Sequence, residues 1–436
     1  MTITKYQTKP LQCWQKAKEL RLNYFKSVMN AKRDGKLLAM VDSGSFLELP
    51  AGLGDDYIPF EGHPYGASVG GDPEFSQKCV EATEAKGFAR DMCAYTRNFW
   101  GSMFLNEYLY GGEFPKGEFA IWRSACESEG KFYQLVAEHM DIPGYALDFP
   151  LLPGQEKDED VIEYVVDQLG ACIKWMEKVT GRKYDDEKLL KAANNHFEST
   201  RIWAEICVLN KTIPAPLDQK TIYTLYFPSV ALRHMPETLA FYKEVLAEVK
   251  DRVANKIAAL PIEQCRLWDD GIPPWYFLGL YRYLEQYGAV VLGSQYTYAL
   301  HGAWEDYPDG SWGPARLPQE RGMRMKTRED ILRAIAILYE EKPMIRAMAL
   351  PEIKSRQLLR IVQDWHADGV MMHSNRGCPG LSFGQVENYL ALQKAGIPTI
   401  IYEGNAADKR ELSEAQVLDR IDGLMEQMGI KKLAGV

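Results

Sequence analysis

Residues 368–405, DGVMMHSNRGCPGLSFGQVENYLALQKAGIPTIIYEGN, have the pattern of one repeat of an open parallel sheet. The apolar segment DGVMMHS predicts a buried strand, residues 383–395 predict a helix, and IPTIIYEG predicts a second strand. Strands joined by such a helix pair in parallel in the same sheet. Cys378 lies in the loop after the first strand, which is where open α/β sheets bind ligands.

The same alternation of strands and helices occurs in both halves of the chain. The first half has predicted helices at 12–29 and 73–88, strands at 119–122 and in DIPGYALDFP, and a Gly- and Pro-rich stretch at 44–71. The second half has predicted strands at CRLW and AVVLG, a helix at 278–287 and a final helix from Ser413. Between them, residues 158–258 show long helical periodicity.

We therefore predict an α/β fold with two Rossmann-like lobes, each built on a doubly wound parallel sheet and joined by a helical region. The predicted parts are an N-terminal lobe at 1–152, a helical region at 153–258 and a C-terminal lobe at 259–436.

Length and composition agree with a compact multidomain protein. The 436 residues exceed the length at which one hydrophobic core usually keeps growing. A formal net charge of -9 disfavours nucleic-acid binding. The N-terminal sequence lacks the apolar core of a signal peptide, and no segment has the roughly 18 uninterrupted apolar residues of a membrane span. We expect a cytoplasmic protein that binds neither nucleic acid nor membrane.

Several common catalytic motifs are absent from the sequence. It contains no Gly-x-x-x-x-Gly-Lys-Ser/Thr phosphate loop and no Gly-x-Gly-x-x-Gly, so we expect the chain to bind no ATP itself. It also lacks the Gly-x-Ser-x-Gly elbow of many hydrolases and any Cys-x-x-Cys pair.

Three of the eight cysteines lie where packing alone explains them poorly. Cys93 follows a predicted helix in DMCAYTR, Cys126 follows the strand FAIW in RSACESEG, and Cys378 follows GVMMH. Thiolates are soft ligands that suit iron–sulfur clusters, and three of them leave one iron of a 4Fe-4S cube open. An arginine lies near each cysteine in the chain and would offset the charge of a cluster: Arg97, Arg123 and Arg376.

The alternative is that these cysteines are small core residues, because free cysteine is among the most buried residue types. We expect that role, or a surface one, for the other five: Cys13, Cys79, Cys172, Cys207 and Cys265.

The segments around the three cysteines resemble the 2-hydroxyacyl-CoA dehydratase and benzoyl-CoA reductase superfamily of anaerobes. Residues 368–405, followed by LSEAQVLDRIDGLMEQM, are similar to the family's strand–cysteine–helix–strand ending. DMCAYTRN and SACESEGK match its two upstream cysteine motifs, and FLELPAGLG resembles its N-terminal stretch. The chain looks most like the larger, cluster-bearing B subunit of the ATP-dependent class I benzoyl-CoA reductases. DDYIPFEGHPYGASVGGD and GIPPWYFLGLYRYLEQYG depart from the dehydratase pattern, and their aromatic residues favour an aryl substrate.

The resemblance implies that Cys93, Cys126 and Cys378 hold a 4Fe-4S or double-cubane-type cluster at the interface of the lobes. It implies a heteromer with a homologous second cluster-bearing subunit and an ATP-hydrolysing activator supplied by ferredoxin. ATP is then used by that partner and is not bound here. The implied reaction is low-potential electron transfer to benzoyl-CoA or another aryl-CoA, giving a cyclic dienoyl-CoA.

Two residues are candidates for the proton donor of such a reaction. Glu48, in SGSFLELP, would have a raised pKa if it were buried beside an anionic cluster, and His63, in EGHPYG, is the second candidate. The alternatives are an acid at a helix N-terminus for Glu48 and a solvated loop residue for His63.

Other functions remain open from the sequence. A 2-hydroxyacyl-CoA dehydratase subunit would use the same cluster for radical dehydration to an enoyl-CoA. A non-catalytic electron-relay subunit would hold a fully ligated cluster. Four aromatic residues are candidates to line an aryl or CoA pocket, although at least half of them are expected to be core: Trp268, Trp275, Tyr276 and Trp304.

Overall fold

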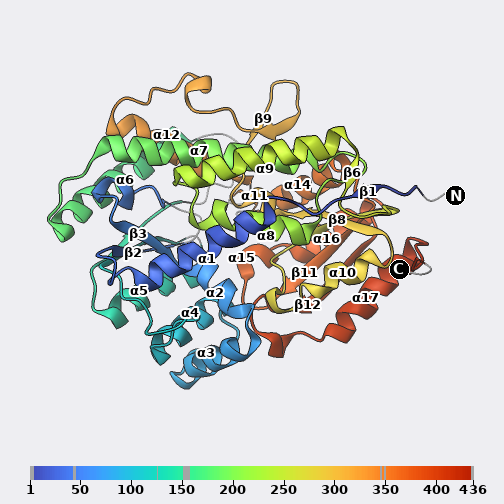
Figure 1. Ribbon diagram of the computed structural model, residues 1–436, viewed down its shortest axis with the longest axis horizontal. Helices are drawn as coiled ribbons and strands as arrows, with labels where there is room; N and C mark the ends of the chain where they lie inside the picture. Colours follow the sequence, from blue (N-terminus) through green and yellow to red (C-terminus); the bar gives the residue numbers. More distant parts are fainter. Residues whose placement is uncertain are drawn as a thin grey trace.

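Two four-stranded sheets, each with all strands parallel, form the framework of the protein (Figure 1). The structure is a computed structural model and describes residues 4–42, 46–124, 126–150, 158–343, 346–347 and 350–433. The predicted α/β fold with two Rossmann-like lobes is confirmed. The predicted boundary between residues 152 and 153 lies outside the described residues, and the three-part division of the chain stays a proposal.

The first sheet has the strand order β3-β2-β4-β5. Its strands are β2 (Leu37–Val41), β3 (Tyr57–Glu61), β4 (Phe119–Arg123) and β5 (Gly144–Leu147). β2 and β3 were not predicted from the sequence. β3 contains Pro59, which a sheet tolerates on an edge strand such as this one. The Gly- and Pro-rich stretch therefore contains the edge of the sheet, the short helix η1 (Pro50–Leu53) and helix α2 (Gly62–Gly70).

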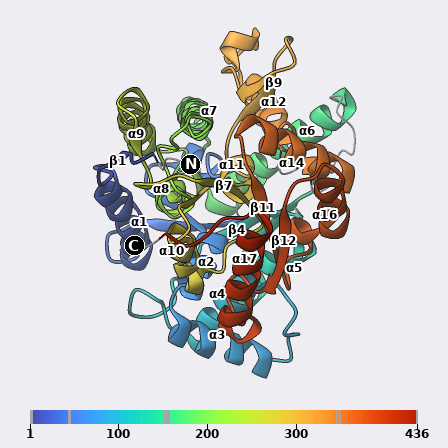
Figure 2. The ribbon, with the colours of Figure 1, turned by 90° about the vertical axis from the view of Figure 1, so that its right-hand side faces the viewer.

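The second sheet has the strand order β12-β11-β7-β8. Its strands are β7 (Cys265–Asp270), β8 (Ala289–Ser294), β11 (Gly369–Asn375) and β12 (Thr399–Gly404). The repeat predicted from residues 368–405 is present: α16 (Gln385–Lys394) connects β11 to β12, which pair from Val370 opposite Thr399 to Asn375 opposite Gly404. α16 and α17 (Glu414–Gln427) lie beside β12 (Figure 2).

Long helices follow the first sheet, as predicted, and include α7 and α9, which run side by side across the top of Figure 1. They are α6 (Glu159–Thr180), α7 (Asp186–Leu209), α8 (Gln219–Ala231) and α9 (Pro236–Ala254). Asp158 caps α6 by accepting hydrogen bonds from the first amides of the helix. α12 (Arg328–Glu340), from the second half of the chain, packs with α6 in the core of the first lobe. The lobes are therefore interlocked.

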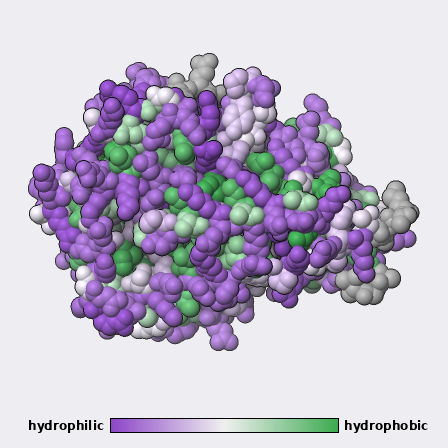
Figure 3. All heavy atoms as spheres, turned by 45° about the horizontal axis from the view of Figure 1, so that its top comes forward, coloured by the Kyte–Doolittle hydropathy of each residue, from purple (hydrophilic) through white to green (hydrophobic). Residues whose placement is uncertain are grey.

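The remaining elements connect and cover the sheets. They are α1 (Trp14–Asn30), α3 (Pro73–Ala85), α4 (Ala94–Leu105), α5 (Glu127–Met140), η2 (Trp275–Phe277), α10 (Gly279–Glu285), α11 (Gln295–Ala299), η3 (Gln319–Arg321), α14 (Pro351–Asp364), α15 (Pro379–Ser382), η4 (Lys409–Glu411) and the two-stranded pairs β1 (Gln7–Thr8) with β6 (Ile257–Ala258) and β9 (Trp304–Asp306) with β10 (Trp312–Pro314). None of the described helices combines the length and apolar character that a membrane span requires. The face in Figure 3 is mostly hydrophilic, with scattered hydrophobic patches.

Candidate active site

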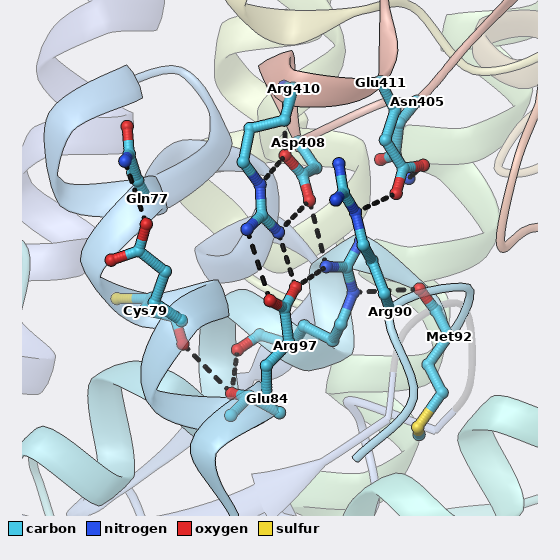
Figure 4. Close-up of polar contacts among 12 residues, drawn as sticks. Gln77, Cys79, Glu84, Arg90, Met92, Arg97, Asn405, Asp408, Arg410 and Glu411 are labelled. Carbon is cyan, nitrogen blue, oxygen red and sulfur yellow. Dashed lines mark hydrogen bonds and ion pairs between the residues drawn. The ribbon is translucent and has the colours of Figure 1, made fainter. Parts of the chain in front are cut away.

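A network of buried and partly buried charges joins the two lobes (Figure 4). Arg97 on α4 donates from Nη1 to Glu84 at 3.1 Å and to Asp408 at 3.0 Å. Its Nε donates to the backbone oxygen of Met92 at 3.1 Å. Arg410 donates to the same two carboxylates from the other side. The network therefore fixes the segment before Cys93 relative to the segment after β12.

The loop that carries Cys378 lies directly against the loop that carries Cys93. Gly377 has a φ of 75°, a left-handed conformation that favours glycine. A Cβ at this position would lie 2.6 Å from the backbone oxygen of Met92 and 2.8 Å from that of Asp91. Only a hydrogen fits there, so the two cysteine loops touch through their backbones.

The structure brings the three predicted cysteines together. Cys93 precedes α4, Cys126 precedes α5 and Cys378 precedes α15. Burial and then the Glu129 carboxylate raise the pKa of the Cys126 thiol, and the Cys93 and Cys378 thiols act in the same direction. The Cys93 and Cys378 sulfurs therefore both lie within electrostatic range of the Cys126 sulfur. The N-termini of α4 and α5 favour negative charge beside two of them.

The geometry of the three thiols differs from that of a single-ion site. Within the described part of the chain, no three His, Cys, Asp or Glu side chains are arranged to hold one metal ion. In an iron–sulfur cluster each thiolate binds a different iron, so its ligands stand further apart than those of one ion. Arg123 is buried, lies 3.4 Å from Asp42 and is within electrostatic range of Cys126. Three thiols, two helix N-termini and this guanidinium suit an anionic cluster.

The predicted roles of the three arginines are only partly correct. Arg123 lies within electrostatic range of the Cys126 thiol, as expected, although Asp42 and the Tyr339 ring are its nearer partners. Arg97 is instead occupied by the network that joins the lobes. Arg376 has a 59% exposed side chain and pairs with Glu403, so the prediction that it offsets charge at the thiols is wrong. Arg376 is close to Cys378 in sequence, but its ion pair with Glu403 holds the guanidinium at the surface.

The other five cysteines are buried, in agreement with the alternative core role. Cys13, which precedes α1, donates from Sγ to Glu248 of α9 at 2.5 Å. Among the four candidate aromatic residues, Trp268 and Trp304 are buried, and Tyr276 donates its hydroxyl to the backbone oxygen of Asn405. Trp275 is half-buried and lines a cavity.

Glu48 is fully buried, in the turn before η1, and its carboxylate lies 3.3 Å from Nδ1 of His196. Burial alone would raise the pKa of Glu48, but His196 and then Arg233 lower it to about 2. This direction is opposite to the rise expected for a carboxyl beside an anionic cluster, because His196 and Arg233 stabilise the ionised form. Burial lowers the pKa of His196 to about 4, so the pair consists of a carboxylate and a neutral imidazole near pH 7. A carboxylate in this state accepts a proton and does not donate one.

His63 lies on α2 and not in a solvated loop, so that alternative is wrong. Its Nε2 lies 3.5 Å from Glu129, and its side chain is 15% exposed. Burial and then Arg123 lower the pKa of His63 to about 3, which keeps the imidazole neutral near pH 7. Glu129 thus stands between His63 and Cys126. Glu129 was not predicted from the sequence, although its position three residues after Cys126 was a usable signal.

Tyr296 is a further residue that the sequence analysis missed. It is buried on α11, directly after the carboxyl end of β8, and lies within electrostatic range of Cys378 and Cys93. Its hydroxyl interacts with that of Tyr95, two residues after Cys93. The rule that placed Cys378 at a strand end would also have selected Tyr296 in LGSQYTY.

Comparison with known proteins relates this chain to subunits of enzymes that are named for CoA thioesters. The family model described as 2-hydroxyglutaryl-CoA dehydratase, D-component, matches residues 56–428. The chain is 26% identical over 410 residues to the (R)-phenyllactyl-CoA dehydratase alpha subunit of Clostridium sporogenes, covering 93% of each chain. It is 25% identical over 362 residues to the (R)-2-hydroxyisocaproyl-CoA dehydratase alpha subunit of Clostridioides difficile, covering 82% of each.

A benzoyl-CoA reductase is also among the relatives. The B subunit of benzoyl-CoA reductase from Thauera aromatica is 22% identical over 365 residues, covering 80% of this chain and 79% of that one. The dehydratase alpha subunits above are more similar to this chain than the B subunit is. The expected special resemblance to the B subunit of benzoyl-CoA reductase is therefore weakly supported. The superfamily itself is confirmed by both groups of relatives and by the match over residues 56–428. The chain belongs to the 2-hydroxyglutaryl-CoA dehydratase D-component family.

Proposed function

We propose that this chain is the iron–sulfur subunit of a 2-hydroxyacyl-CoA dehydratase, with Cys93, Cys126 and Cys378 as the cluster ligands. The observation that carries the proposal is the convergence of three thiols, from loops of both lobes, beside a buried arginine. The dehydratase relatives support this reaction better than the aryl-CoA reduction expected from the sequence. When bound, a cluster with one iron free of protein ligands supplies low-potential electrons to the thioester.

The side chains around the thiols supply the remaining functions. Glu129 and His63, 3.5 Å apart, are positioned to accept or pass on a proton beside Cys126. Arg123 offsets negative charge at the site, and the buried Tyr296 limits the access of water. We propose that the chain works with a homologous second subunit and an ATP-hydrolysing electron activator, since the relatives are named as subunits.

An aryl-CoA reductase subunit is the second candidate. The specific observation in its favour is a cavity beside the thiols whose inner wall consists of aromatic rings. The relationship to the B subunit of benzoyl-CoA reductase agrees with it. Both candidates use the same thiols and the same substrate class, a CoA thioester, and they differ in the product.

Anaerobic purification with iron and sulfide analysis tests the ligand assignment. We expect Cys126→Ser and Cys378→Ser to lose iron and visible absorption, and Cys13→Ser, outside the site, to keep both. Iron that stays at the wild-type level in both variants would contradict the proposal. Product analysis of the complete complex then separates the candidates: an enoyl-CoA from a 2-hydroxyacyl-CoA indicates the dehydratase, and a cyclic dienoyl-CoA from benzoyl-CoA indicates the reductase. A loaded complex that converts neither thioester would indicate an electron relay.

A further inference from the structure

A cavity of about 790 Å³ lies between the two lobes, next to the thiol site. Its walls come from α1, α2, α8 and α11 and from the turn at η2. Cavities of roughly 300–1,000 Å³ are typical of sites for organic ligands. This volume is therefore sufficient for a large part of a cofactor-sized molecule.

The inner end of the cavity is an aromatic box formed by Tyr223, Tyr226, Trp275 and Tyr296. The rings of Tyr223 and Trp275 are 5.2 Å apart at 65°, and those of Tyr226 and Tyr296 are 5.4 Å apart at 58°. The rings of Trp275 and Tyr296 complete the box at 6.4 Å and 69°. Aromatic rings attract one another in such edge-to-face arrangements, so the box is suited to a further ring.

The aromatic box also forms the partition between the cavity and the thiols. Tyr296 lines the cavity and lies within electrostatic range of Cys378 and Cys93. Trp275 donates from Nε1 to the hydroxyl of Tyr95, two residues after Cys93. A group held in the box is therefore separated from the thiol site by one layer of side chains.

The charged side chains that line the cavity are three cations and one carboxylate, Asp72, so its charge is positive on balance. The cations are Lys18 and Arg21 on α1 and Lys220 on α8, at the outer rim. The Nζ atoms of Lys18 and Lys220 lie 5.0 and 6.0 Å from the centroid of the Trp14 ring. Among the described residues, no carboxylate forms an ion pair with either lysine. Three cations at one rim, in a chain of net charge -9, favour phosphate groups.

A second groove of about 670 Å³ has a different character. It is lined by residues of the β9–β10 pair and of α14. Its four arginines share the lining with three carboxylates, Glu305, Asp306 and Glu341, and two of them are neutralised in pairs, Arg321 with Glu341 and Arg360 with Asp306. It therefore offers weaker attraction for phosphates.

We infer that the cavity between α1, α8 and α11 binds an acyl-CoA thioester whose acyl group carries an aromatic ring. The ring occupies the box of Tyr223, Tyr226, Trp275 and Tyr296, and the CoA phosphates bind Lys18, Arg21 and Lys220. This inference rests on the proposed function, because it assigns a place and an acyl type to the CoA thioester. It applies to an aromatic 2-hydroxyacyl group as well as to an aryl group.

Equilibrium binding tests the inference without any turnover. The purified chain is titrated calorimetrically with free coenzyme A, acetyl-CoA and benzoyl-CoA. We expect benzoyl-CoA to bind at least about tenfold more tightly than acetyl-CoA. Arg21→Glu and Lys220→Glu should weaken all three ligands by about tenfold or more. Lys26→Glu, also exposed on α1 but outside the cavity, is the matched control and should leave binding unchanged.

The acyl end is tested with Trp275→Leu, which should abolish the preference for benzoyl-CoA and leave the affinity for free coenzyme A unchanged. Phe277→Leu, in the same turn but outside the cavity wall, should keep the preference. If CoA thioesters bind but the rim variants have no effect, or the aromatic preference is absent, this placement is wrong and the proposed function stands. If the wild-type chain binds no CoA compound, the proposed function fails together with the inference.

Discussion

Arg97 on α4 and Asp408 after β12 lie 311 positions apart in the chain and form an ion pair of 3.0 Å. Both side chains are almost completely buried, at 0% and 2% exposure. The pair links the loop of Cys93 to the lobe that provides Cys378 (Figure 4). The thiol site therefore depends on a contact that is remote from it in sequence.

Breaking this contact should destabilise the protein strongly. Asp408→Asn leaves the buried Arg97 without one of its charged partners, and we expect the free energy of unfolding to fall by about 3–5 kcal/mol. The control is Arg90→Ala, which removes the ion pair between Arg90 and Glu411. Because the Arg90 side chain is 52% exposed, this variant should lower the free energy of unfolding by less than about 1 kcal/mol. Denaturant unfolding measures both. Equal effects of the two variants would show that burial does not strengthen the pair.

Gly377→Ala should separate the two cysteine loops. The new Cβ would meet the Met92 carbonyl, and the positive φ adds strain of roughly 1–2 kcal/mol. Gly396→Ala is the matched control, because Gly396 has a φ of 74° but no heavy atom within 4 Å of a Cβ. We expect Gly377→Ala to reduce iron content after anaerobic purification and Gly396→Ala to retain it. Full iron content in both variants would disprove the role of the close contact.

Asp269 should make stability depend on pH. Burial raises its pKa from 3.8 to about 7, while the hydroxyl of Tyr281, at 2.5 Å, opposes the shift. The unfolded chain loses this proton near pH 4 and the folded chain only near pH 7. The contribution of Asp269 to stability therefore declines as pH rises through this interval, by up to about 4 kcal/mol, and is constant above it.

Asp269→Asn removes this titration. The difference in unfolding free energy between wild type and variant, measured by denaturant unfolding at several pH values, should follow the decline between pH 4 and pH 7. A difference that does not change with pH would mean that Asp269 is ionised in the folded protein throughout the range.

Glu48 should have the opposite pH dependence. Its pKa is lowered from 4.5 to about 2, so its stabilising contribution is present above pH 4.5 and is lost as pH falls toward 2. Glu48→Gln should lower the unfolding free energy at pH 7 by about 3 kcal/mol. We expect iron content to stay intact, because Glu48 is not among the three proposed ligands. An unfolding free energy at pH 7 equal to that of the wild type would contradict a carboxylate stabilised by His196 and Arg233.

Local patterns were sufficient to predict much of this fold. The unit β11–α16–β12 was recognised because its apolar periods and turn residues lie within one continuous stretch. The proximity of the three cysteines was expected from their positions after predicted strands and helices and from the resemblance to the dehydratase and reductase superfamily. The long helices after the first sheet were predicted from periodicity alone.

Other features depend on contacts between distant segments and could not be predicted in this way. The position of α12 in the first lobe is determined by its packing with α6, and the outward direction of Arg376 by its pair with Glu403. The low pKa of Glu48 requires His196 and Arg233, which are remote in sequence. Tyr296 acquires its significance only because the lobes enclose a cavity beside it.

The contact of Gly377 with Met92 has a consequence for biosynthesis. Cys93 and Cys126 belong to the lobe of the first sheet and Cys378 follows β11 of the second, so the ligand set is complete only after β11 has been translated. Insertion of the proposed cluster on all three thiols therefore requires the two lobes to have come together. Until then the protein presents three partly accessible thiols in one place, which is the form that a cluster-assembly system has to recognise and that oxygen can damage.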